Sequence, residues 1–230
     1  MNQLRIPSEL VFLFALTLLA LSVSMTAAAD FGVSMIVAPA YIISLKWPVL
    51  TFGQAEYVVQ GLLFILFCIC MRRLRPLYLV SFATGLLYGV ILDSWRLIPL
   101  LSPETVGQAP LPLRIALLLL GMVMTSFAVA LLFRVYIYPQ VYDFFVKGIT
   151  ARYRLDLTRT KLVFDISLLT ISLAMSLLLF GRLNGVGIGT LLMTFCNGFL
   201  IGGFDRFIQK RLCIKPLFHS VATRFEGDIA

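Results

Sequence analysis

Long apolar runs alternate with short polar segments along the whole chain. Six runs reach or approach the roughly 20 residues that a helix needs to cross a bilayer. The second run is short unless its helix begins nearer Phe52. The pattern predicts an all-α integral membrane protein, with residues 1–230 as a single transmembrane domain. The expected helices are Leu10–Ala29, Tyr57–Met71, Leu77–Ile98, Leu113–Val135, Leu162–Phe180 and Val186–Ile208.

Two connections between these runs are too apolar to be ordinary loops. Residues 30–45 contain Pro39, and residues 136–149 contain Pro139. Each follows one expected helix, precedes another, and is too short to cross a bilayer twice. Non-helical backbone at membrane depth must be covered by protein or line a wet cavity. We expect either re-entrant half-helices or amphipathic helices lying on the membrane surface.

The charge distribution supports a membrane location and sets an expected topology. The chain is 60% hydrophobic and 13% charged, with a net charge of +8. Fifteen of the 19 Lys and Arg residues fall on one side of the six expected helices, and four fall on the other. The positive-inside rule then places both termini, including the tail 209–230, in the cytoplasm. We therefore expect a multi-pass protein of the cytoplasmic membrane and no nucleic-acid partner.

The first apolar run also has features of a signal peptide. Arg5 precedes it, and the small residues Ala27 to Ala29 follow it. This order is typical of a cleavable secretory signal, although the run is long for one. Cleavage would leave the orientation of the rest of the chain unchanged.

The two halves of the chain carry similar features in the same order. Each half, about 8–98 and about 113–208, has one helix, a proline-bearing connection and two further helices. Because each half crosses the membrane three times, the second half must enter from the opposite side, which predicts an inverted repeat. The corresponding positions are Pro39 and Pro139, Gln60 and Asp165, Gly85 and Gly198, Gly89 and Gly202, and Asp93 and Asp205.

Carboxylates inside apolar helices are costly, so they usually face the interior of a helix bundle. Asp93 is a candidate contact for a substrate or coupling ion, and its alternative partner is Arg96, three residues on. Asp165 has the same two interpretations, with Lys161 as its alternative partner. For Asp205, an interfacial position beside basic residues is favoured.

Two uncharged polar side chains are further candidates for contact with a solute. Asn197 lies near the centre of the last helix, where it can bind a ligand or join two helices. Gln60 lies about one turn inside the second helix. In the inverted arrangement Gln60 and Asp93 lie toward the outer face and Asp165 toward the inner face.

Glycines cluster in and near the last helix. The segment from Gly185 to Thr190 reads G-V-G-I-G-T. It lacks the spacing of a dinucleotide-binding fingerprint. Close helix packing is one interpretation, and docking of an anionic group at the helix N-terminus is the other. Thr190 is a further candidate for contact with a substrate or ion, and it could also satisfy backbone carbonyls at the helix start. The expected structural glycines are Gly85, Gly89, Gly185, Gly187, Gly189, Gly198 and Gly202.

Cysteine and histidine usage predicts no metal site, no cofactor and no catalytic centre. The four cysteines lie in or next to apolar helices, and His219 is the only histidine. A histidine-based triad cannot be assembled from this set. We therefore expect a protein that is not an enzyme.

Four motifs in the second half match a known pattern. They are the P-x-x-x-D stretch from Pro139 to Asp143, the early helical Asp165, Gly185 to Thr190, and Asn197 to Gly202. Together they resemble the YczE/YitT-like bacterial membrane proteins. That resemblance implies a multi-pass cytoplasmic-membrane protein, distantly similar in organisation to the substrate-binding subunits of energy-coupling-factor vitamin transporters.

The pattern favours a small-solute transporter or a substrate-binding permease subunit. The solute would lie between the halves, contacted by Asn197, Gln60 and the acids. The alternative is a non-transporting accessory protein that assembles with another membrane protein or with its own copies. Its docking surface would be the basic segment 134–161.

Overall fold

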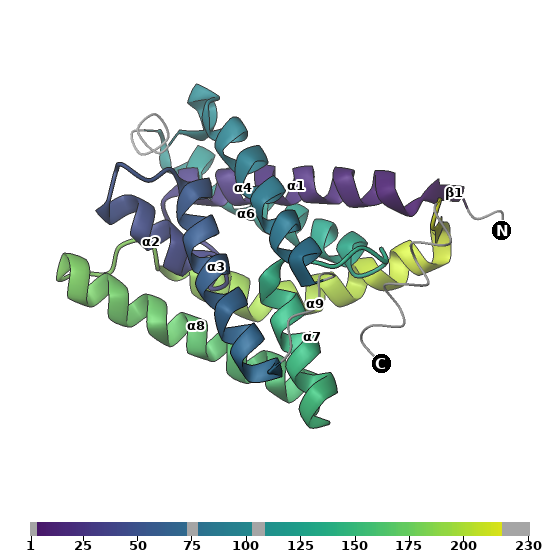
Figure 1. The fold of residues 1–230 in the computed structure, drawn as a ribbon. Helices are drawn as coiled ribbons and strands as arrows, with labels where there is room; N and C mark the ends of the chain where they lie inside the picture. Colours follow the sequence, from purple (N-terminus) through teal and green to yellow (C-terminus); the bar gives the residue numbers. More distant parts are fainter. Residues whose placement is uncertain (1–3, 73–77, 103–108, 218–230) are drawn as a thin grey trace.

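The chain folds into a bundle of long helices (Figure 1). The structure is a computed structural model, and it describes residues 4–72, 78–102 and 109–217. His219 and the end of the expected tail lie outside these residues. The elements are β1 (Leu4–Pro7), α1 (Ser8–Ala29), α2 (Ala38–Lys46), α3 (Phe52–Met71), α4 (Tyr78–Arg96), the 3-10 helix η1 (Pro99–Leu101), α6 (Leu111–Leu132), α7 (Val141–Tyr153), α8 (Leu157–Phe180), α9 (Ile188–Arg211) and β2 (Leu212–Lys215).

Six of the described helices are long and apolar enough to cross a membrane. They are α1, α3, α4, α6, α8 and α9, the six that the apolar runs predict. Many large apolar side chains on their outer faces are exposed, as expected where lipid is the solvent. The predicted class, an all-α membrane protein, is confirmed.

Helix α3 begins five residues earlier than the apolar run suggested. The Thr51 hydroxyl accepts a hydrogen bond from the Gln54 amide, and the Gln54 side chain accepts one from the Thr51 amide. This reciprocal capping box satisfies two backbone donors that a helix start would otherwise leave free. The earlier start brings Glu56 into the second turn of a membrane-spanning helix.

Helices α1 and α6 pack against each other in opposite directions along most of their length. The Thr125 hydroxyl donates to Ser22 at 2.8 Å. Toward the end of α1, Arg114 pairs with Asp30, whereas Tyr136 beyond the end of α6 donates to Glu9. Residue numbers increase along α1 in the direction in which they decrease along α6. The first helices of the two halves therefore run antiparallel.

The remaining contacts repeat between the first half (α1 to α4) and the second half (α6 to α9). Helix α3 packs on α7 of the second half, and α8 packs on α2 of the first. Likewise α1 packs on α4 and α6 on α9, while α2 meets α3 and α7 meets α8. This exchange, together with the antiparallel α1 and α6, is the arrangement of an inverted repeat.

The short helices α2 and α7 are the two proline-bearing connections. The Tyr142 hydroxyl contacts Glu56 near the start of α3, and the Tyr153 hydroxyl contacts the Cys70 carbonyl near its end. Helix α7 therefore runs parallel to α3 and begins deep in the bundle. Residues 38–42 of α2 are buried as well. Such burial fits re-entrant half-helices better than surface-lying ones.

Helix α1 forms much of the core. Most of its length is buried, and both α4 and α6 pack against it. A glycine of α6 permits close approach to it: a Cβ on Gly121 would lie 2.9 Å from the Ser22 carbonyl oxygen of α1. This packing gives α1 a structural role in the bundle, beyond what the signal-peptide interpretation assigns to it.

The two ends of the described chain form a short parallel pair that the sequence did not predict. Strand β1 pairs with β2 in the register Leu4 to Leu212 and Pro7 to Lys215. Both ends therefore lie on one side of the molecule (Figure 1). An even number of membrane crossings gives that result.

Candidate functional site

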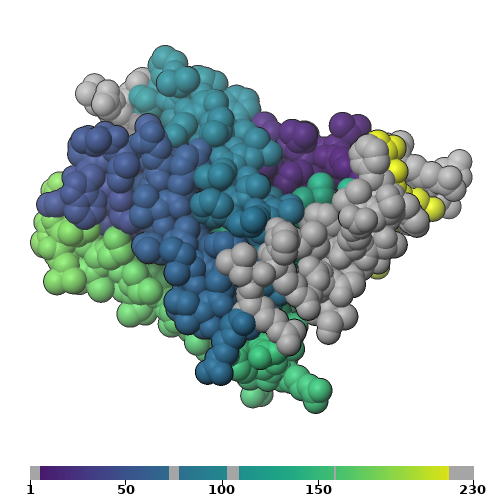
Figure 2. All heavy atoms as spheres, viewed as in Figure 1, coloured from purple at the N-terminus to yellow at the C-terminus, as the bar shows by residue number. Residues whose placement is uncertain are grey.

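A buried group of polar side chains lies where α3 and α4 of the first half meet the start of α7. We call it the polar cluster: Glu56 and Gln60 of α3, Tyr88 of α4, and Gln140 and Tyr142 at the start of α7. Glu56 and Tyr88 are 0% exposed, and Gln60 and Tyr142 are 1% exposed. In the space-filling view, the side chains of α3 and α4 form part of the surface on this side (Figure 2).

One oxygen of Glu56 holds the polar cluster together. Its Oε2 accepts a hydrogen bond from Gln60 Nε2 at 3.1 Å, and another from the Tyr142 hydroxyl at 2.9 Å. Glu56 and Gln60 are four residues apart, so they share one face of α3. The second donor comes from the other half of the molecule. The carboxyl group therefore lies at the interface of the two repeats.

Four polar atoms of the cluster have no hydrogen-bond partner among the described residues. They are Glu56 Oε1, Gln60 Oε1, the Tyr88 hydroxyl and Gln140 Nε2. Tyr88 lies within electrostatic reach of Glu56. Nor does any Lys or Arg of the described chain form an ion pair with Glu56. Buried polar groups are normally hydrogen-bonded, and each exception costs about 1–3 kcal/mol.

Gly85 of α4 makes room for the cluster. A Cβ at this position would collide with Gln60 Oε1. One turn further along, a Cβ on Gly89 would collide with the ring of Tyr57. These two predicted structural glycines let α3 and α4 approach closely, and Gly85 also sets the position of the Gln60 amide.

Asp93 lies at the N-terminus of α3, beyond the polar cluster. Its carboxylate accepts hydrogen bonds from the Thr51 hydroxyl at 2.5 Å and from the Gly53 amide at 2.8 Å. A carboxylate at a helix N-terminus is stabilised by the helix dipole. Arg96, its expected alternative partner, lies over the rings of Tyr41 and Phe52 and also within electrostatic reach of Asp93.

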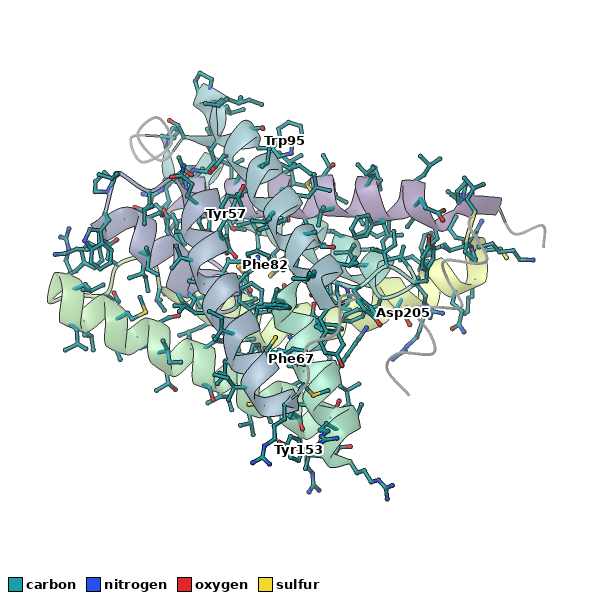
Figure 3. All side chains as sticks on the ribbon, in the orientation of Figure 1. Tyr57, Phe67, Phe82, Trp95, Tyr153 and Asp205 are labelled. Carbon is teal, nitrogen blue, oxygen red and sulfur yellow. The ribbon has the colours of Figure 1, made fainter. Side chains whose placement is uncertain are left out.

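Aromatic side chains lie on the other side of the cluster, where Figure 3 shows Phe67 between α3 and α7. Phe67, Tyr78, Tyr138 and Phe144 form one buried group. The Ser81 hydroxyl donates to the Pro139 carbonyl, and the Thr84 hydroxyl donates to the Tyr138 carbonyl. These bonds hold the non-helical segment before α7 against α4.

A second polar group joins α7 and α8. Lys161 Nζ lies 3.0 Å from an oxygen of Asp143 and 3.2 Å from an oxygen of Asp165. For Asp165 the sequence allowed either contact with a solute or ion, or an i,i+4 pair with Lys161. The structure contains the pair with Lys161. Glu56 and Lys161 thus contact different sides of the first turn of α7, since Tyr142 contacts Glu56 and Asp143 contacts Lys161.

Asn197 joins two helices. Its Oδ1 accepts a hydrogen bond of 3.3 Å from the Ser126 hydroxyl of α6. None of the described hydrogen bonds connects Asn197 with Gln60. The two residues expected to share one solute site therefore take part in separate contacts.

The glycine segment before α9 supports backbone pairing between two loops. The Gly189 amide donates to the Phe31 carbonyl at 2.8 Å, and the Val33 amide donates to the Gly185 carbonyl at 3.2 Å. A Cβ on Gly187 would lie 2.6 Å from the Phe31 oxygen. Only a residue without a side chain permits this approach.

The Thr190 side chain forms a hydrogen bond with a backbone amide, whereas the sequence predicted a hydrogen bond to a backbone carbonyl. Its hydroxyl oxygen accepts from the Gly187 amide at 3.2 Å. Because the Gly187 and Gly189 amides already have acceptors, fewer donors remain at this helix end for an anion. Gly198 and Gly202 have nothing within 4 Å of an added Cβ.

Asp205 pairs with Arg134 from the end of α6. The contact has two bonds, of 2.6 Å and 2.7 Å. The carboxylate accordingly holds the pKa of Arg134 above its usual range. Basic residues lie near Asp205 as predicted, but its partner comes from another helix.

Sequence reasoning missed Glu56, Tyr88 and Gln140. Glu56 lies just before the apolar run, so a hydropathy boundary at Tyr57 excluded it. The Thr51-to-Gln54 capping box was the available signal, because it places the helix start before Glu56. No comparable signal marks Tyr88, which reads as an ordinary aromatic residue in an apolar helix.

These observations define a helical membrane protein built as an inverted repeat, with a buried carboxyl group between its halves. A family model matches residues 6–206, and the chain belongs to that family, which is described as a family of unknown function (DUF6198). No curated protein and no solved structure matches the chain.

Proposed function

We propose that the protein is a small-solute transporter, or the substrate-binding subunit of a permease, and that its solute binds at the polar cluster. The observation that carries this proposal is the buried Glu56, which contacts both halves of the repeat. In transporters built from inverted repeats, substrate and ion sites lie at the repeat interface, where half-helices end. The start of α7 is such a position.

A purely structural role accounts less well for the polar cluster. A structural polar network is stable when all its members are hydrogen-bonded. Here one oxygen of Glu56 has two donors, whereas the other has none among the described residues. Retaining four such atoms in a membrane interior lowers stability, so a functional use explains them better.

The packing of the two halves suggests how the solute would cross. Helices α3 and α4 are packed together, whereas α8 and α9 share no extensive contact in the described chain. We propose that these two seams close alternately, which exposes the site first to one side and then to the other. Alternating access in inverted repeats is largely a rocking of one bundle against the other.

The accessory-protein alternative relies on free basic residues in the segment 134–161. Arg134 and Lys161, at the two ends of that segment, are paired with acids of the same chain. Their pairing reduces the charge available to a partner and favours the transport proposal.

The cytoplasmic location of both termini and the YczE/YitT-like relationship stay predictions.

Uptake by protein reconstituted into liposomes tests the proposal. Radiolabelled amines, amino acids, sugars and carboxylic acids would be offered to wild type, Glu56→Gln and Asp156→Asn. Asp156→Asn also replaces an acid by its amide but keeps a side chain able to cap α8. We expect uptake of at least one class, lost only in Glu56→Gln. Absence of uptake, or equal uptake in both variants, contradicts the proposal.

A further inference from the structure

We infer that the polar cluster binds the protonated amino group of a primary amine, with Glu56 as the countercharge. This inference rests on the proposed function in taking the polar cluster as the solute site. Amine binding can nevertheless be measured separately from transport. Three features of the cluster support it: its unpaired acceptors, its charge, and its donor at the start of α7.

Acceptor atoms dominate the unpaired set. Glu56 Oε1 and Gln60 Oε1 accept only, and the Tyr88 hydroxyl can accept as well as donate. A primary ammonium carries three N–H donors. The number of donors on one ammonium therefore equals the number of unpaired oxygens on α3 and α4, a match that a single hydroxyl or a carboxylate does not offer.

The net charge selects a cation. Glu56 is the only side chain of the cluster that can carry a charge near neutral pH, and no described Lys or Arg pairs with it. An uncompensated carboxylate in the interior of the bundle is strongly unfavourable, and a bound cation removes that cost. An anionic group near the same oxygen would add repulsion.

The number of ligands argues against a divalent metal ion. Calcium takes six to eight oxygen ligands, and magnesium requires octahedral coordination. The cluster offers three unpaired oxygens, because Glu56 Oε2 already accepts from Gln60 and Tyr142. No group of three His, Cys, Asp or Glu able to hold a metal occurs in the part of the chain that the structure describes.

The donor at the start of α7 indicates a second feature of the solute. Gln140 Nε2 is unpaired, and it lies in the turn that leads into Tyr142. The N-terminus of α7 also carries partial positive charge. A hydrogen-bond acceptor on the same amine would supply a partner for Gln140 Nε2.

The other charged group makes a poorer amine site. Lys161 lies between Asp143 and Asp165 and supplies them with an ammonium from within the chain. In the second half, carboxylates thus surround one protonated amine of the protein itself. We infer the same kind of contact in the first half, between Glu56 and the amine of a solute. In the first half, the residue corresponding to Lys161 is Glu56, so the amine must come from outside.

The test is ligand binding by the full-length protein purified in detergent, followed by thermal unfolding. The probes are ethylammonium, tetramethylammonium, ethanol and propionate at equal ionic strength. We expect a saturable rise in the unfolding temperature with ethylammonium alone. Loss of a hydrogen bond to a charged group should weaken affinity about tenfold or more in Glu56→Gln. Tetramethylammonium has the charge but no N–H donor. The wild type should therefore bind it no more tightly than Glu56→Gln binds ethylammonium.

Tyr88→Phe keeps the ring and removes one acceptor, so it tests the site even if Glu56→Gln fails to fold. Weaker ethylammonium binding in Tyr88→Phe with unchanged binding in Asp156→Asn supports the inference. Equal binding of ethylammonium and tetramethylammonium, or no binding of either, overturns it. Ethylammonium binding without uptake in liposomes contradicts transport alone, whereas uptake of neutral or anionic solutes without amine binding contradicts this inference alone.

Discussion

The α3–α4 seam and the α8–α9 seam occupy corresponding positions in the two halves, but they differ in packing. In the first seam, Gly85 and Gly89 lie under side chains of α3. In the second, the corresponding Gly198 and Gly202 have nothing within 4 Å of an added Cβ. Figure 1 shows α8 and α9 diverging, whereas α3 and α4 lie together.

The chemistry of the two halves differs in the same way. Glu56 in the closed seam has no basic partner among the described residues, whereas Lys161 beside the open seam holds two acids. Two repeats with the same topology can thus hold different packing states at once. The molecule thus shows a packed arrangement for one helix pair and a separated arrangement for the corresponding pair of the other half.

Crosslinking gives the largest expected effect on this comparison. In a background with all four cysteines replaced by serine, Tyr57→Cys with Gly89→Cys should react with a short bifunctional thiol reagent without added solute. Leu162→Cys with Gly202→Cys, the corresponding pair, should react only when a transported solute is present. Gel mobility reports both. Reaction of the second pair without solute, or never, would contradict alternate closure of the seams.

Lys161→Met should cause the largest loss of stability among the single substitutions. It removes the ammonium that neutralises Asp143 and Asp165, which lie close to it in a partly buried position. We expect a loss of about 3 kcal/mol in the free energy of unfolding. Denaturant titration in detergent measures it, with the exposed Lys210→Met as the control. A loss equal to that of the control would show that the triad is not a stabilising unit.

Gly85→Ala should destabilise the packed seam, because its methyl group collides with the Gln60 amide. Overpacking typically costs about 1–3 kcal/mol, against a gain of up to about 1 kcal/mol for removing a helical glycine. The matched substitution, Gly198→Ala, meets no neighbour and should be neutral or stabilising. Thermal unfolding of both variants checks this. An equal effect at the two positions would remove the asymmetry on which the comparison depends.

Ser126→Ala should have the smallest effect. It removes the single hydrogen bond that joins α6 to Asn197 of α9. Such bonds contribute about 0.6 kcal/mol on average in membrane proteins. Ser172→Ala, which loses only a bond to its own helix, is the control. The difference in unfolding free energy between the two variants gives the contribution of the bridge, and a value of zero would leave Asn197 without a structural role.

The helices and their repeat could be predicted because they depend on local pattern. Apolar runs fix the spans, and Pro39 and Pro139 mark the half-helices. The position of Asp93 shows where that reasoning ends. Its spacing suggested Arg96, which lies within electrostatic reach, but its hydrogen-bond partners are Thr51 and Gly53, forty residues or more away in the chain.

The site was only partly predictable, for a similar reason. Gln60 was recognised because it lies clearly inside an apolar run. Glu56 lies at the edge of that run, and its contact with Tyr142 depends on how far the re-entrant helix reaches into the bundle. That depth is a property of packing between halves, which a single sequence does not encode in any local pattern.

The pairing of β1 with β2 sets a condition on the order of assembly. Residues 4–7 are synthesised before the six candidate membrane spans, and their partners at 212–215 are synthesised after them. Helix α1 can meet α4 and α6 while synthesis continues, but this pair can form only when the final helix is complete. The strand pair is therefore a late contact in assembly, because it joins segments that lie on either side of all six candidate spans.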